Sequence, residues 1–281
     1  MPAADLTPVA AGAQSQSGWD LFLIFAAANI VATTLQVGAS LGGVTSAPAM
    51  IGLVAAGAAI GAGLVAALAP VGSRLGVPSM VAARAVLGHT GAAFVATVLF
   101  VTNFAWIAVN NVIAASVCAR MLPLPLGERG WAIVLGLVST AVVAGGPGAV
   151  RRADRWAVPL MLAAGLFITW AVLHLPADSP AASAAVAAGP VSLPLLLDVV
   201  IGYQVSWLLM FADYSRFTRA PRTSAWAVFL GLSLTALWLM PLGWRLARHA
   251  GSADPGAMLA AADAGMLAAV LVTLATLTTN S

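Results

Sequence analysis

The sequence predicts an all-α protein that crosses a membrane several times. Of its 281 residues, 61% are hydrophobic and only 7% are charged, whereas a soluble domain carries about 25% charged residues. A chain this poor in charge cannot cover a water-exposed surface, which excludes a cytosolic enzyme. Its apolar residues gather in eight stretches that reach or approach the roughly 20 residues a helix needs to span a bilayer.

These stretches are the expected spans. They run over Leu21–Gly43, Ala49–Pro70, Ala92–Ala119, Trp131–Gly145, Trp156–Leu175, Leu193–Ala212, Ser224–Leu242 and Met266–Ser281. The fourth is short, and no polar tail follows the eighth. Because a helix that ended inside the bilayer would expose unsatisfied carbonyls to lipid, the sequence suggests a chain truncated at its C-terminus.

The segment before the first span is rich in Ala, Ser, Gln and Pro and carries no Arg, so it lacks the basic region of a signal peptide. We expect residues 1–18 to be a disordered tail and residues 19–281 to form one transmembrane domain.

The distribution of Arg predicts the orientation, because inner loops are enriched in positive charge. With the N-terminus inside, four Arg residues fall on outer loops, namely Arg120, Arg129, Arg245 and Arg248. Eight fall on inner loops: Arg74, Arg84, Arg151, Arg152, Arg155, Arg216, Arg219 and Arg222. We therefore expect a multi-pass protein of the cytoplasmic membrane with its N-terminus inside.

Several function classes are excluded or disfavoured by composition. The net charge of +3 is carried by scattered Arg residues, which argues against a nucleic-acid partner. A single cysteine, Cys118, excludes a disulfide framework and a cysteine-based metal site. His89, His174 and His249 have no metal-ligand spacing, and Gly145–Gly148 lacks the lysine of a phosphate-binding loop. We expect no cofactor and no enzymatic activity.

Small residues in the first two spans predict close helix packing. Gly38 and Gly42 lie four residues apart, as do Gly57 and Gly61, and this spacing lets helices approach closely.

The third span carries a polar face. Asn103, Trp106 and Asn110 are spaced i, i+3 and i+7 and share one side of a helix. An indole between two carboxamides suits a flat heteroaromatic ligand, since the ring stacks while the amides match its polar edge. An interhelical hydrogen-bonded pair with Trp106 as filler is an equally weighted alternative. Asn111 points elsewhere and is interpreted as a packing residue.

The sixth span is the second polar site. Gly202–Trp207 places a glycine, Tyr203, Gln204 and Ser206 in mid-membrane, which favours a locally opened helix that lines a cavity, as in secondary transporters. The first span has a weaker version around Asn29, for which an ordinary helix remains an alternative. At the end of the chain, Thr278 and Thr279 could supply oxygen ligands to sodium, although threonine is also common in spanning helices.

Four segments carry a family resemblance: Gly18-Trp19, Gly76–Gly88, Ser206–Phe217 and Thr278–Asn280. Through them the chain resembles the nucleobase–cation symporter-1 family, which includes cytosine permeases, hydantoin and allantoin transporters and a branch linked to hydroxymethylpyrimidine uptake. The resemblance implies an inverted-repeat fold of five plus five core helices. In that fold helices one and six are broken at the midplane and the ligands bind beside the breaks. The segment Gly76–Gly88 corresponds to the family's inner loop between helices two and three.

The resemblance also implies site residues. Trp106 matches the stacking tryptophan of helix three, and Asn103 and Asn110 match its amide neighbours. The sodium ligands of sodium-coupled members correspond to the carbonyls of Ala27, Ile30 and Ala275 and the side chains of Thr278 and Thr279. Where cytosine permeases place an aromatic on helix six, this chain has Gln204, between Tyr203 and Trp207, which leaves the second stacking partner open.

The expected function is that of a permease. It would import a nucleobase-like heterocycle such as cytosine, another pyrimidine or purine, or hydroxymethylpyrimidine, by symport with sodium or alternatively protons. Trp106 would stack the ring, and its polar edge would contact Asn103, Asn110, Tyr203, Gln204 and Ser206. We expect the chain to act as a monomer in the lipid bilayer. The alternatives are an inactive truncated fragment and a membrane-embedded enzyme.

Overall fold

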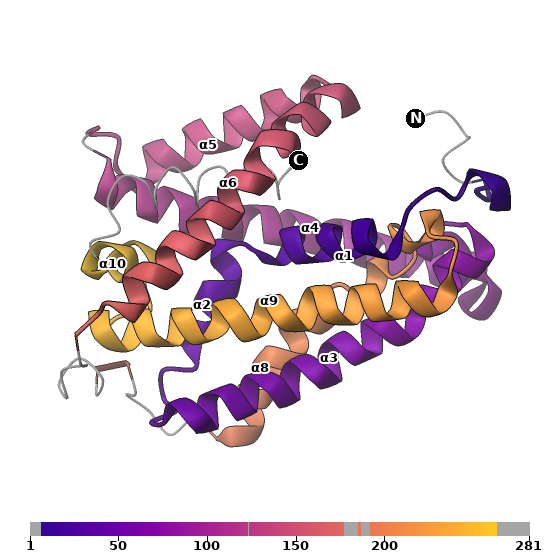
Figure 1. Ribbon diagram of the computed structural model, residues 1–281. Helices are drawn as coiled ribbons and strands as arrows, with labels where there is room; N and C mark the ends of the chain where they lie inside the picture. Colours follow the sequence, from indigo (N-terminus) through magenta and orange to yellow (C-terminus); the bar gives the residue numbers. More distant parts are fainter. Residues whose placement is uncertain (1–6, 123, 177–184, 187–191, 263–281) are drawn as a thin grey trace. The chain divides into compact units, whose positions relative to one another are not determined.

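The computed structural model describes residues 7–122, 124–176, 185–186 and 192–262, and these are helical in most of their length (Figure 1). The long helices are α1 (Gly18–Asn29), α2 (Ala32–Ser40), α3 (Ala47–Leu75), α4 (Ser79–Met121), α5 (Gly127–Ala144), α6 (Pro147–Leu173), α8 (Leu193–Val205) and α9 (Pro221–Ala250). Shorter elements are η2 (Ala11–Ala13), η3 (Leu208–Met210), η4 (Ser215–Phe217) and α10 (Pro255–Ala261).

The described helices confirm a multi-pass membrane protein. Five of them are long and apolar enough to cross a bilayer: α3, α4, α5, α8 continued through η3, and α9. The interrupted pair α1 and α2 makes a sixth. The fifth expected span forms α6, whose apolar part is Val158–Leu173. The eighth expected span lies outside the described residues. The seven expected before it are all helical and follow the expected order.

Two helices begin earlier than hydropathy alone predicts. The expected inner loop Arg151–Arg155 is helical, because Gly146 adopts a positive φ of 77° and Pro147 starts α6 at the position where proline is favoured. The expected inner loop Gly76–Gly88 is also largely helical, since α4 begins at Ser79. Gly88, with φ 66°, is a kink inside α4 that separates Ser79–Leu87 from the rest of the helix.

The chain divides into two compact units. The first comprises residues up to Asn29, Leu53–Phe104 and Leu193–Ala236, and the second comprises Ile30–Gly52, Ala105–Ser192 and the residues from Leu237 onward. Each has its own apolar core. In the first, Phe25 of α1 packs with Val65 of α3 and Leu232 of α9. In the second, α2, α4, α5, α6, α9 and α10 share one buried cluster.

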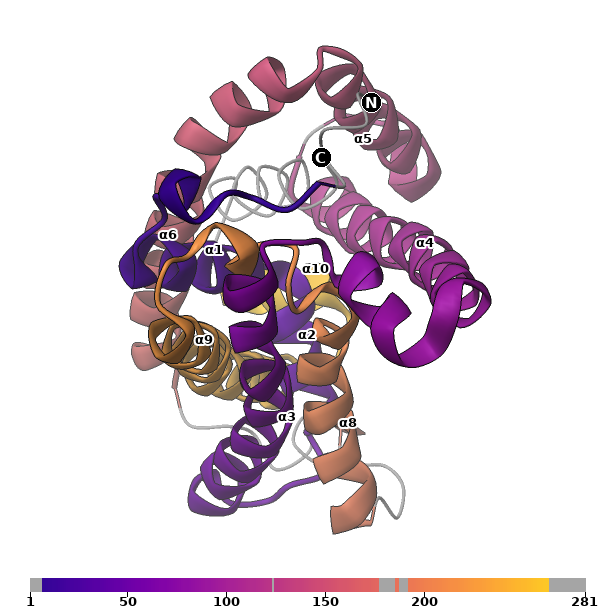
Figure 2. The ribbon, with the colours of Figure 1, turned by 90° about the vertical axis from the view of Figure 1, so that its right-hand side faces the viewer.

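Glycines bring α3 and α8 together in the first unit, and Figure 2 shows the two helices side by side. A Cβ added at Gly57 would lie 2.7 Å from the Cβ of Val200, and one at Gly61 would lie 2.7 Å from the Cβ of Gln204. The prediction that Gly57 and Gly61 serve helix packing is confirmed, and their contact is with the sixth span.

The end of the first unit where α3 finishes is held by side chains that bind backbone groups. Ser79 Oγ accepts a hydrogen bond from the Ala212 amide at 2.8 Å and donates one to Asp213 Oδ2 at 2.5 Å. Ser215 Oγ donates to the Ala69 carbonyl of α3 at 2.8 Å. The turns after α8 are thereby fixed to α3 and to the start of α4, which explains why short polar residues stand at these positions.

The described part of the predicted N-terminal tail has defined contacts in the same unit. Gln14 Nε2 donates to the carbonyls of Ser73 and Arg216, each at 2.9 Å. The Gln16 amide donates to the Phe217 carbonyl at 3.1 Å. Because Gln14 binds both the end of α3 and η4, this segment bridges the same elements as the serine contacts.

In the second unit, α2 and α9 cross at two glycines. A Cβ at Gly38 would meet the Met240 carbonyl oxygen at 2.0 Å, and one at Gly243 would meet the Leu35 carbonyl oxygen at 1.9 Å. The two helix backbones are therefore in direct contact, which confirms the packing role predicted for Gly38. The predicted packing role of Asn111 is also confirmed, because its Nδ2 donates to the Ala132 carbonyl of α5 at 2.8 Å.

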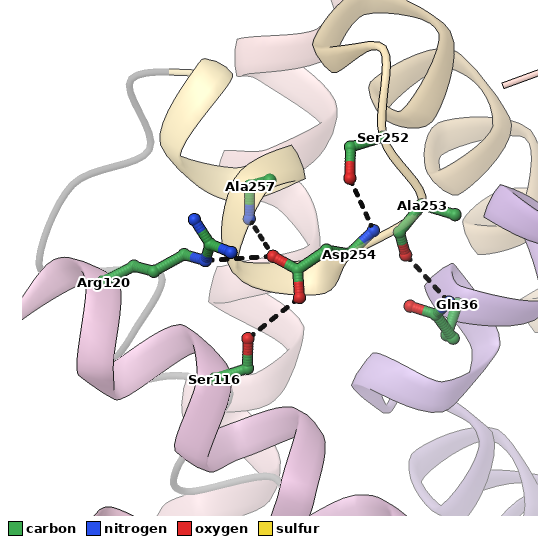
Figure 3. A network of polar contacts seen from close by, with 7 residues as sticks. All are labelled: Gln36, Ser116, Arg120, Ser252, Ala253, Asp254 and Ala257. Atoms are coloured by element: carbon green, nitrogen blue, oxygen red, sulfur yellow. Dashed lines mark hydrogen bonds and ion pairs between the residues drawn. The ribbon is translucent and has the colours of Figure 1, made fainter. Parts of the chain in front are cut away.

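The segment between α9 and α10 is held by a polar network (Figure 3). Asp254 caps α10 by accepting from the Ala257 amide at 2.8 Å, pairs with Arg120 at 3.0 Å and accepts from Ser116 Oγ at 3.0 Å. The Gln36 amide of α2 donates to the neighbouring Ala253 carbonyl at 2.9 Å. This segment therefore connects the middle of α2 with the C-terminal end of α4.

Gly61→Ala should destabilise the chain. The added methyl would lie 2.7 Å from Gln204 Cβ and 2.8 Å from the Ile201 carbonyl, closer than carbon atoms approach, and such overpacking costs about 1–3 kcal/mol. The matched control is Gly63→Ala on the same helix, where no atom lies within 4 Å of the new Cβ. Thermal unfolding of the detergent-solubilised protein should show a lower Tm for Gly61→Ala alone. Equal Tm values for the two variants would contradict the packing described for α3 and α8.

Candidate functional site

Two spans lose helical geometry in their middle. The first is interrupted at Ile30 and Val31, between the end of α1 and the start of α2, where Val31 is extended with φ −135° and ψ 161°. The sixth is interrupted after Val205, where Ser206 and Trp207 form a turn before η3. Both predicted helix breaks are therefore confirmed.

The candidate residues of the sixth span lie at the end of α8. Tyr203 and Gln204 are buried, and Gln204 is completely so. Gln204 Nε2 donates to the Leu232 carbonyl of α9 at 3.1 Å. Ser206 Oγ donates to the Tyr203 carbonyl at 2.7 Å, so the hydroxyl satisfies a carbonyl at the point where the helix ends.

Asn29, the last residue of α1, joins the same cluster and was not among the predicted site residues. It is completely buried, and its Nδ2 donates to Thr235 Oγ1 at 2.8 Å and to the Leu232 carbonyl at 3.2 Å. A side-chain amide at the last helical position before a break is the sequence signal that could have identified Asn29. The partner positions on α9 carry no such signal, because Leu232 takes part through its backbone.

Aromatic side chains surround the interruption after α8. Phe25 of α1 makes edge contacts with Trp207 and Tyr214, at centroid distances of 5.8 and 5.7 Å. Trp207, next to the position where the second stacking partner is expected, is thus engaged with α1. Its half-buried ring belongs to the same unit as Gln204 and Asn29.

The candidates of the third span lie along α4, which is helical from Asn103 to Asn110 as predicted. Their burial rises along the helix. Asn103 is exposed, Trp106 is half-buried and Asn110 is buried. Asn103 belongs to the first unit, and Trp106 and Asn110 belong to the second.

The cation candidates fall partly within the described residues. Ala27 lies in the last turn of α1, and Ile30 lies in the interruption itself. Because the last four carbonyls of a helix have no partner inside it, the end of α1 is a source of oxygen ligands. Ala275, Thr278 and Thr279 lie outside the described residues. Among those that are described, no three His, Cys, Asp or Glu side chains gather as a metal site would require.

Comparison with known proteins identifies the family. The model of the permeases for cytosine/purines, uracil, thiamine and allantoin matches residues 8–281. A Bacillus subtilis (strain 168) protein named "Putative purine-cytosine permease YxlA" is 27% identical over 241 residues, which are 80% of this chain and 49% of that protein. The chain thus spans about half the length of this curated relative.

Two solved structures share the fold. One is Mhp1, a nucleobase-cation-symport-1 family transporter in a closed conformation with bromovinylhydantoin bound, with a TM-score of 0.77 and 18% identity over 98% of this chain and 66% of Mhp1. The other is inward-facing Mhp1, with a TM-score of 0.78 and 16% identity over 100% and 65%. At these identities the likeness shows the fold alone.

The fold is therefore the inverted-repeat transporter fold with broken first and sixth helices. Together with the family match over nearly the whole sequence, it shows that the chain belongs to the nucleobase–cation symporter-1 family of permeases for cytosine/purines, uracil, thiamine and allantoin.

Proposed function

We propose that the chain is a secondary transporter that imports a nucleobase-like heterocycle by cation symport. The observation that supports this most directly is the pair of interrupted spans, each with a buried amide at its last helical turn, Asn29 in α1 and Gln204 in α8. Polar side chains are expensive in the middle of a membrane and are typically retained for a ligand pathway. In secondary transporters, such breaks give ligands access to backbone groups.

The proposed substrate residues follow from the chemistry of a flat heterocycle. Trp106 stacks on the ring face, and a base–aromatic stack is worth about 1–3 kcal/mol. The polar edge is recognised by Asn103, Asn110, Tyr203, Gln204 and Ser206. Amides suit this task because each offers both a donor and an acceptor.

The proposed coupling ion is sodium, with the proton as the alternative. Its ligands are the carbonyls of Ala27, Ile30 and Ala275 and the hydroxyls of Thr278 and Thr279. All five are oxygens, which hard cations prefer. Cation and substrate bound together would stabilise the occluded state more than either alone, and this differential binding couples the two fluxes.

The transporter is proposed to act as a monomer in the cytoplasmic membrane with its N-terminus inside. Uptake of labelled cytosine, uracil, allantoin, hydantoin and hydroxymethylpyrimidine, each with and without sodium, tests the proposal. Uptake of none of these compounds would refute it.

Trp106→Ala should weaken binding of the transported compound about tenfold to a hundredfold, as expected for the loss of a 1–3 kcal/mol stack. Binding of the labelled compound to membrane vesicles measures the change. Trp156→Ala is the control, because this tryptophan of α6 is 72% exposed and its loss should leave the Kd unchanged. A normal Kd for Trp106→Ala in vesicles that contain the protein would rule out the stacking role.

Thr279→Ala should raise the sodium concentration needed for half-maximal uptake, by about tenfold if the lost ligand contributes about 1.4 kcal/mol. Thr140→Ala is the control, since the hydroxyl of Thr140 donates to the Gly136 carbonyl of its own helix at 2.8 Å. Uptake that follows the proton gradient and does not respond to sodium would show that the ion is assigned wrongly.

A further inference from the structure

The side-chain amide of Gln204 has one possible orientation. Its neighbour on α9 is the Leu232 carbonyl, 3.1 Å away, and a carbonyl oxygen only accepts hydrogen bonds. The NH₂ group of Gln204 must therefore face α9, and its Oε1 must face away from that carbonyl. Turning the amide over would bring two acceptor oxygens together.

The surroundings hold this orientation in place. The same Leu232 carbonyl accepts from Asn29 Nδ2 at 3.2 Å, and Asn29 is itself bound to Thr235 Oγ1. On the other side, the Cβ of Gln204 lies against Gly61 of α3. Gln204 is thus enclosed by α1, α3 and α9 in one unit and has little freedom to rotate.

The remaining acceptor of this amide is unsatisfied within the described part of the chain. Gln204 Oε1 is buried and has no hydrogen-bond partner among the described residues. A buried acceptor without a partner is destabilising, and such a group in a native protein calls for a functional explanation. A group able to satisfy it must bring a hydrogen-bond donor.

We propose that Gln204 Oε1 is a specificity-determining acceptor that selects heterocycles presenting a ring N–H or an exocyclic NH₂ at the end of α8. This inference rests on the proposed transport function and adds to it the polarity of one substrate contact. A site built to bind an N–H group strongly rejects the analogue that lacks it, because its own acceptor is then left unpaired. Gln204 cannot compensate by turning its amide over, since its NH₂ group is held by the Leu232 carbonyl.

The inference is tested by crossing a protein change with a ligand change. Gln204→Met removes the acceptor and keeps the length of the side chain. The ligand pairs are uracil with 1,3-dimethyluracil, and hydantoin with 1,3-dimethylhydantoin, in which methyl groups replace the N–H donors. Affinities for the chain in membrane vesicles are measured by competition against labelled uracil and labelled hydantoin.

The wild-type chain should prefer at least one parent compound over its dimethyl derivative by about tenfold or more. Gln204→Met should lose most of that preference, by weakening the parent about tenfold while changing the derivative less than about twofold. Gln36→Met is the matched control, because Gln36 also donates its amide to a backbone carbonyl, that of Ala253, and also has a buried Oε1 without a partner among the described residues. Unlike Gln204, it lies in the middle of a helix, α2, and not at a helix break. Gln36→Met should keep the wild-type preference.

Three outcomes would overturn the inference. A wild-type chain that binds the dimethyl derivatives as well as the parents has no donor-selective contact, and this result needs no variant. If Gln204→Met weakens the binding of parent and derivative equally, Gln204 is a packing residue. If the variant changes only the sodium requirement, Gln204 acts on the ion. Binding of neither parent nor derivative by the wild type, together with no uptake of the wider set of compounds, would refute the transport function itself.

Discussion

A backbone amide or carbonyl inside a membrane needs a hydrogen-bond partner, and the first unit depends on how this requirement is met where its helices stop. A helix end leaves several backbone groups without partners, and lipid supplies none. In this chain short polar side chains take the place of water. Ser206 binds the Tyr203 carbonyl at the end of α8, and Ser79 binds the Ala212 amide in the turns that follow. The interruption after α8 thus has a hydroxyl close by that satisfies one of its carbonyls.

The amides at the two interruptions add a tertiary constraint to this local one. Asn29 and Gln204 come from helices far apart in the sequence and donate to one carbonyl of α9. The position of each helix end is thus defined by the same atom. A shift of α9 along its axis would disturb both ends at once, which gives the seventh span a direct connection to the residues proposed to bind substrate.

Much of this architecture is predictable from sequence because lipid imposes a simple rule. Apolar length locates the spans, and the polar cluster Gly202–Trp207 locates the break in the sixth. The partners of those residues are not predictable, because Gln204 binds Leu232 through a backbone group that every residue possesses. The start of α4 at Ser79 and the early start of α6 at Pro147 were also missed, since hydropathy measures affinity for lipid and not the tendency to form helix. Asn103, Trp106 and Asn110 do follow the predicted helical spacing, but their roles remain predictions, as do those of the cation candidates.

The ion pair between Arg120 and Asp254 makes one attachment of the α9–α10 segment sensitive to the surrounding solution. The two side chains are 49% and 34% exposed, so the pair contributes at most about 1 kcal/mol and is screened by salt. The bonds from Ser116 and from the Ala257 amide to the same carboxylate depend much less on ionic strength. High salt should therefore weaken the attachment of this segment to α4 slightly without breaking it. The attachment decreases gradually with ionic strength because only one of these contacts is an ion pair.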